Sequence, residues 1–109
     1  MKKQFKLQPE EFVQLIEPIG SCLASDRITV GGEKVGYMYR EEPNDESDGG
    51  WRFFAGDESE QYSDDPNNFE IYDVNTIANY DRAIIPYLSF EAGSQLERVA
   101  GTDSFEANA

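Results

Sequence analysis

The chain has 109 residues, with 22 Asp and Glu against nine Lys and Arg, a formal net charge of −13 and a pI near 4.1. This length predicts one domain around one core. An acidic field of this size repels phosphate backbones and anionic membrane surfaces, so it disfavours nucleic-acid and lipid binding and favours a basic protein partner.

Residues 9–20 have the pattern of a short amphipathic helix. Pro9 and the two glutamates after it suit a first helical turn. Apolar side chains then recur at the spacing of one helix face: Phe12, Leu15, Ile16 and Ile19. Pro18 and Gly20 end the pattern. We therefore expect an N-terminal helix that packs on the core.

Three strands are predicted next, at about residues 21–30, 34–41 and 50–56. The pair Gly31-Gly32 is typical of a hairpin turn, and a polar segment separates the second strand from the third. Because these connections are short, the three strands are expected to pair antiparallel in chain order. Tyr37, Tyr39 and Phe53 are expected to be substantially buried.

Trp51 leaves two interpretations open. Alternation places Trp51 and Phe53 on one face of the third strand, with Arg52 and Phe54 on the other. Trp51 is then a core residue, which we favour, or an exposed anchor of a binding patch. Arg40 and Arg52 are expected to pair with nearby acids.

The segment 64–88 predicts short helices. Asp73 is a candidate N-cap for a turn that carries Val74, Ile77 and Ala78, and Asp81 is a candidate cap for a second one. A last strand is expected at residues 95–99. The fold class is therefore α+β over residues 1–100, an antiparallel sheet of about four to five strands with the N-terminal helix and short helices packed on it. Residues 101–109 are expected to be a frayed tail.

One set of segments resembles a known family. The runs CLASDRIT, VGYMYREEP, DGGWRFFAGDE and IYDVNTIANYD occur in that order between Cys22 and Asp81, within a region of resemblance that extends to about Arg98. They resemble the immunity protein 33 family, which is associated with bacterial polymorphic-toxin systems. The resemblance implies a protein that binds and neutralises a toxin, and it implies no catalytic residue.

Acids crowd into the middle of the chain. Between residues 41 and 65 there is one base, Arg52, and ten acids: Glu41, Glu42, Asp45, Glu46, Asp48, Asp57, Glu58, Glu60, Asp64 and Asp65. If the partner is basic, these loops steer its approach. The alternative is that the acid serves solubility alone. The residues predicted to bind the partner are Glu41, Glu42, Asp45, Glu46, Asp48, Asp57 and Glu58.

Several kinds of site are excluded or disfavoured. The chain has no histidine and one cysteine, which excludes a Ser–His–Asp or Cys–His nucleophile, a zinc site and an intramolecular disulfide. Cys22 is expected to be a core thiol. A calcium loop of the EF-hand type starting at Asn44 fails at its twelfth position, Ala55. A looser calcium site remains an alternative, built from Asp45, Asp48, Asp57 and Glu58.

The sequence thus predicts a non-enzymatic, acidic, cytoplasmic protein of the immunity type that needs no cofactor or metal and binds a basic protein toxin. Its N-terminal residues lack the apolar run of a signal peptide. The alternative is a ligand- or metal-binding regulatory domain that has no toxin partner.

Overall fold

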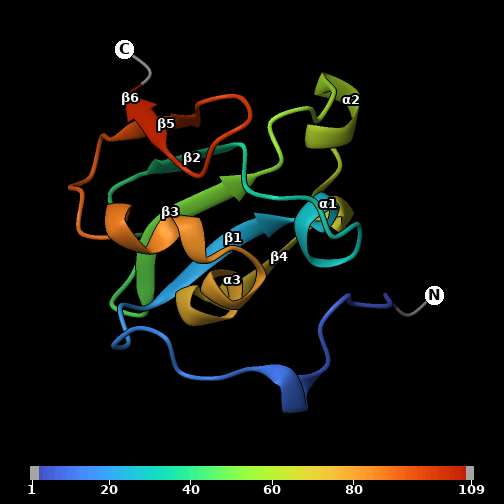
Figure 1. Cartoon of the computed structure of the whole chain (residues 1–109), viewed down its shortest axis with the longest axis horizontal. Helices are drawn as coiled ribbons and strands as arrows, with labels where there is room; N and C mark the ends of the chain where they lie inside the picture. The colour runs from blue at the N-terminus through green and yellow to red at the C-terminus, as the bar shows by residue number, and fades with distance from the viewer. Residues whose placement is uncertain (1–2, 108–109) are drawn as a thin grey trace.

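The computed structural model describes residues 3–107, which form a six-stranded mixed sheet with the order β4-β1-β3-β2-β5-β6 (Figure 1). The strands are β1 Ser21–Ser25, β2 Tyr37–Arg40, β3 Asp48–Phe54, β4 Phe69–Asp73, β5 Gln95–Arg98 and β6 Phe105–Ala107. The helices are η1 Pro9–Glu11, α1 Asp26–Thr29, α2 Glu60–Ser63, η2 Pro66–Asn68, α3 Val74–Tyr80 and η3 Arg82–Tyr87. No helix within residues 3–107 is long and apolar enough to cross a membrane.

The sheet corrects the predicted topology. The α+β class is confirmed, but the sheet has six strands and is mixed, because β1 pairs with β3 in parallel while β2 pairs with β3 antiparallel. The predicted strand 21–30 ends at Ser25, whose hydroxyl accepts a hydrogen bond from the Arg27 amide and caps α1. Gly32, at φ +79°, then ends α1 and forms no hairpin turn. The connection from β1 to β3 therefore contains α1 and all of β2, which is long enough for a parallel crossover.

The predicted N-terminal helix is wrong. Only η1 forms there, and the chain continues without helix to β1. The reason lies in α3, where the Asn75 carboxamide accepts the amide hydrogen of Leu15 at 2.8 Å and donates to the Val13 carbonyl at 2.9 Å. The side-chain oxygen of Asn79 accepts the Val13 amide at 3.1 Å. These bonds satisfy backbone groups that a helix would have paired internally.

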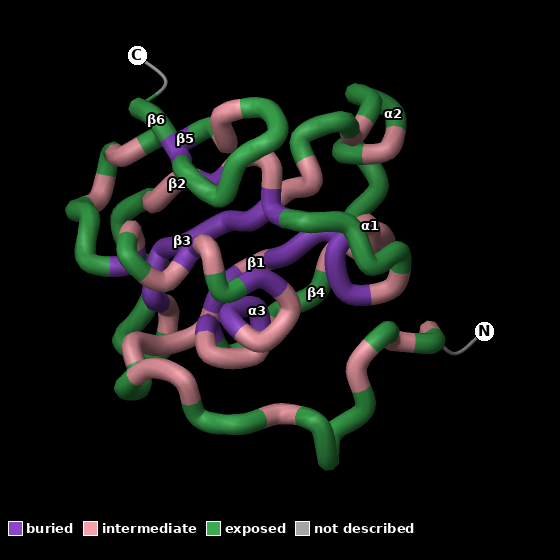
Figure 2. The backbone as a smooth tube through the Cα atoms, viewed as in Figure 1, coloured by how far each residue is buried: buried purple, intermediate pink, exposed green. Residues whose placement is uncertain are grey.

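The core lies between the sheet and the helices α3 and η3 (Figure 2). Trp51 and Phe53 are fully buried with stacked rings 6.0 Å apart, as expected for core residues. The expected burial of Phe53 is confirmed, whereas Tyr37 and Tyr39 are partly buried and lie outside this core. Met38 between them is buried instead, because it stands opposite Phe53 and faces the helices.

The second half of the chain follows its local signals. Asp73 and Asp81 cap α3 and η3 through their carboxylates, and β5 forms where a last strand was expected. The predicted frayed tail contains β6, which pairs with β5. The Tyr87 hydroxyl accepts the Phe105 amide at 2.9 Å, which ties β6 to η3. Residues 108–109 of that tail lie outside the described part.

Candidate functional site

The sheet has a second face, opposite to the one that α3 and η3 cover, and we call it the open face. Cross-strand pairing and alternation assign its side chains: Phe69, Ile71, Leu23, Arg52, Phe54, Tyr37, Tyr39, Gln95, Glu97 and Glu106. Ile71 is 73% exposed and stands opposite the partly buried Leu23. The open face therefore presents apolar and aromatic side chains to solvent, which is a common property of binding surfaces.

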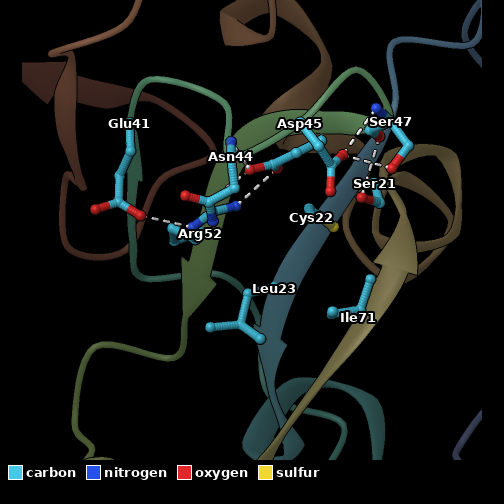
Figure 3. A pocket seen from close by; sticks show the side chains of 10 residues that line it. Ser21, Cys22, Leu23, Glu41, Asn44, Asp45, Ser47, Arg52 and Ile71 are labelled. Atoms are coloured by element: carbon cyan, nitrogen blue, oxygen red, sulfur yellow. Dashed lines mark hydrogen bonds and ion pairs between the residues drawn. The ribbon is translucent and has the colours of Figure 1, made fainter.

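A buried arginine occupies the centre of the open face. Arg52 donates through both terminal nitrogens to the two carboxylate oxygens of Asp48, at 3.0 and 2.9 Å. Its Nε donates to Glu41 at 2.8 Å (Figure 3). The side chains of Arg52 and Asp48 are 8% and 10% exposed, whereas that of Glu41 is 50% exposed. The Asp48 pair is thus a two-point, largely desolvated ion pair, the strongest form of this contact.

The loop before β3 holds Asp48 in its charged form. Besides Arg52, the Asp48 carboxylate accepts the amide hydrogens of Asn44 at 2.9 Å and Gly50 at 2.8 Å. The Arg52 guanidinium, helped by these two amides, holds the pKa of Asp48 far below its usual range. Asp48 in turn raises the pKa of Arg52. Both groups stay charged at physiological pH and serve the structure of the loop.

A cleft of about 400 Å³ opens beside this ion pair. Its walls include Leu23, Ile71 and Asp45, and the carboxylate of Asp45 accepts the Ser47 hydroxyl at 2.7 Å (Figure 3). Cys22, 1% exposed, also borders the cleft, and burial raises the pKa of its thiol. The thiol is therefore protonated at neutral pH and is a poor nucleophile. Within residues 3–107 no group of three or more His, Cys, Asp or Glu is placed to hold a metal ion.

An aromatic hollow lies further along the open face. The rings of Tyr37, Tyr39 and Phe54 lie 5.8 to 6.0 Å apart, and with Glu58 and Glu97 they line a space of about 280 Å³. Two further aromatic contacts extend the cluster, from Phe54 to Phe69 and from Phe69 to Tyr62. Partial burial raises the pKa of Tyr39, and nearby Glu41 adds to this. The hydroxyl is therefore a neutral hydrogen-bonding group at physiological pH.

The seven acids predicted to bind a partner do not form one surface. Four lie in the loop before β3, namely Glu41, Glu42, Asp45 and Glu46, and Asp48 is the first residue of β3 itself. Asp57 and Glu58 follow β3 at its opposite end, and a strand of this length spans roughly 20 Å. Asp57 pairs with Arg27 at 2.7 Å, and Glu58 accepts the amides of Ala55 and Gly56.

Only some of these acids are available to a partner. Glu42 and Glu46 are exposed and make no ion pair or side-chain hydrogen bond within the described residues. The expected pairing of Arg52 with acids is confirmed. The expected pairing of Arg40 with acids is wrong, because Arg40 donates to backbone carbonyls, including that of Phe90 at 2.7 Å, and lies over the Trp51 ring.

The search for sites in the sequence missed the aromatic hollow. Large aromatic residues in strands usually fill the core, so the sequence does not indicate that Tyr37 and Tyr39 line a hollow on the other face. A signal for the hollow lies in β3, where Phe54 alternates with the core residues Trp51 and Phe53 and therefore belongs to the other face of the sheet.

The comparison with known proteins points to one family. The family model for the immunity protein Imm33 domain matches residues 22–108, which run from β1 past β6. No curated protein and no solved structure matches the chain.

Proposed function

The chain belongs to the Imm33 immunity protein family, and on this basis we propose that it binds and neutralises a protein toxin without catalysing a reaction. The family match over residues 22–108 is the observation that carries the proposal. The absence of histidine from the chain and the burial of Cys22 also favour binding over covalent chemistry.

The charge of the chain supports a basic partner. A net charge of −13 attracts a basic protein at long range and speeds its approach. Glu42 and Glu46 contribute to this field without being tied to a cation of the chain within residues 3–107. Asp48 is not available for this role, since its charge is used by Arg52.

Co-expression tests the proposed function directly. A candidate toxin domain, taken from the genes that neighbour the one encoding this chain, is expressed in a bacterial host with and without the full chain, and survival and complex formation are measured. We expect the chain to restore growth and to co-purify with the toxin domain. If growth is not restored and no complex forms, the immunity role is refuted, and the alternative of a regulatory ligand- or metal-binding domain takes its place.

Two matched variants test the role of the acidic loop. Glu42→Gln with Glu46→Gln removes two exposed charges from the loop before β3. Glu10→Gln with Glu17→Gln removes two exposed charges from the N-terminal segment. We expect the loop variant to bind the toxin domain several-fold more slowly at low salt, with a shallower salt dependence than wild type. If the two variants associate with the toxin domain at equal rates, the loop acids do not steer the partner and serve solubility alone.

A further inference from the structure

The aromatic hollow of the open face has the lining of a site for a cation. The rings of Tyr39 and Phe54 are stacked, with an interplanar angle of 11°, and Tyr37 lies within 6.0 Å of both. The face of an aromatic ring carries negative partial charge and attracts ammonium or guanidinium groups. All three side chains are partly exposed, so a partner can reach them.

Two carboxylates face each other beside the hollow. On the open face, Glu97 of β5 stands directly opposite Tyr37 on one side and directly opposite Glu106 of β6 on the other. Like charges in this position destabilise a sheet. Both residues are exposed, and no Lys or Arg within residues 3–107 pairs with either.

The arginine that follows Glu97 in sequence does not pair with these two carboxylates. Arg98 follows Glu97 in β5, so its side chain points to the other face of the sheet. There it pairs with the buried Asp81 and with Asp103, and it lies over the Phe105 ring at 4.8 Å. The carboxylates of Glu97 and Glu106 are thus left for a cation from outside.

Building on the toxin-binding function proposed above, we propose that the aromatic hollow receives an arginine or lysine side chain of the toxin. The cation lies against the rings of Tyr37, Tyr39 and Phe54 and is neutralised by Glu97 and Glu106. Binding places a positive charge beside two glutamates that stand opposite each other in β5 and β6. The negative charge of Glu58 at the edge of the hollow adds to the attraction.

Charge favours a basic partner over a second copy of the chain as the occupant of the hollow. Two copies that met through their open faces would form an isologous interface and bring the same carboxylates together. Each copy carries a net charge of −13, so the long-range force between them is repulsive. A basic segment of a toxin matches the same surface in charge.

The test on the complex uses two pairs of variants and the toxin domain that the co-expression experiment identifies. Glu97→Gln with Glu106→Gln removes the facing charges, and Glu10→Gln with Glu17→Gln is its control of equal charge. Tyr37→Leu removes a ring, and Tyr37→Phe keeps it. We expect the dissociation constant to rise about tenfold for Glu97→Gln with Glu106→Gln and severalfold for Tyr37→Leu, with less than a twofold change for both controls.

Thermal melting of the free variants shows whether the fold is kept. Removal of the facing charges is expected to leave the melting temperature unchanged or slightly higher, because it removes a repulsion. If the variant Glu97→Gln with Glu106→Gln binds the toxin domain as tightly as its control variant does, the proposed site is refuted. The site is also refuted if the free protein forms a dimer that Tyr37→Leu abolishes, because the occupant of the hollow is then a second copy.

A second readout does not depend on the toxin. The full chain is titrated with a capped tri-arginine peptide, and the aromatic signals are followed by NMR, with capped tri-glutamine as control. We expect the ring signals of Tyr37, Tyr39 and Phe54 to shift with tri-arginine alone, the signals of buried Trp51 to stay, and Glu97→Gln with Glu106→Gln to abolish the shifts.

The two readouts separate the two proposals. Neutralisation of the toxin without a response of the rings to tri-arginine refutes the cation site and leaves the immunity role standing. A response of the rings without neutralisation refutes the immunity role and leaves the hollow with affinity for cations.

Discussion

The ion pair at the centre of the open face makes a quantitative prediction for Asp48→Asn. The substitution keeps the size of the side chain and removes the charge that two nitrogens of Arg52 contact. Loss of one member of a buried pair typically costs 3–5 kcal/mol, and we expect about 3 kcal/mol because Glu41 still pairs with Arg52. The matched change Glu41→Gln removes a half-exposed partner and is expected to cost less than about 1 kcal/mol.

The effect depends on pH in a defined direction. The pKa of Asp48 in the folded protein lies below its ordinary value of about 4, so its charge stabilises the fold above pH 4. This stabilisation is lost as the pH falls from about 4 toward the folded pKa, because protons then bind the unfolded state first. The side chain that Asp48→Asn introduces does not titrate. The difference in unfolding free energy between wild type and this variant therefore shrinks below about pH 4.

Urea unfolding followed by Trp51 fluorescence measures both effects, since this single tryptophan is fully buried. With a slope of about 1–3 kcal/mol per molar urea, a 3 kcal/mol loss lowers the midpoint by about 1–3 M at pH 7. A loss below about 1 kcal/mol at pH 7, or one that stays constant down to pH 3, would show that Arg52 and Asp48 do not form a desolvated pair.

Three further predictions concern the core, calcium and the N-terminal segment. Phe53→Ala is expected to lower the unfolding free energy by about 3–5 kcal/mol in the same urea assay, because the ring is fully buried; a change within about 1 kcal/mol would show that β3 is not central to the core. Millimolar calcium is expected to leave the melting temperature unchanged, since Ala55 replaces the required glutamate, and a rise that a chelator reverses would contradict this. Asn75→Ala is expected to cost about 1–3 kcal/mol and to speed hydrogen exchange of the Leu15 amide, and unchanged exchange would mean that Asn75 does not hold this segment.

Features that depend on neighbouring residues were predictable from the sequence. Asp73 and Asp81 cap helices because a carboxylate two or three residues before an amide can accept its hydrogen wherever the chain lies. The strands β2 and β3 follow from alternation over a few residues. The burial of Trp51 beside Phe53 follows from the same alternation once β3 is placed.

Features that depend on distant residues were not predictable in this way. The apolar spacing of residues 12–19 is that of a helix, and Leu15, Ile16 and Ile19 do pack on the core. The carboxamide of Asn75, some 60 positions away, nevertheless holds this backbone outside a helix. The parallel pairing of β1 with β3 likewise depends on the path of the whole intervening segment.

The same limit explains which part of the candidate site was found. The sequence shows where acids are frequent but not which of them a cation of the chain already neutralises. Folding assigns Asp48 and Glu41 to Arg52 and Asp57 to Arg27. It also brings Glu97 and Glu106 together from two strands whose acids are unremarkable in sequence.

The distribution of charge on the open face follows from this assignment. With Arg52 paired to both Asp48 and Glu41, the middle of the face carries one negative charge overall, and the neighbouring side chains are apolar or aromatic. The unpaired carboxylates lie at its borders, in the loop before β3 and on β5 and β6. A centre of aromatic and apolar residues inside a charged rim is the usual composition of a protein interface. Every charge of this rim that the described chain leaves unpaired is negative, which supports the basic partner proposed above.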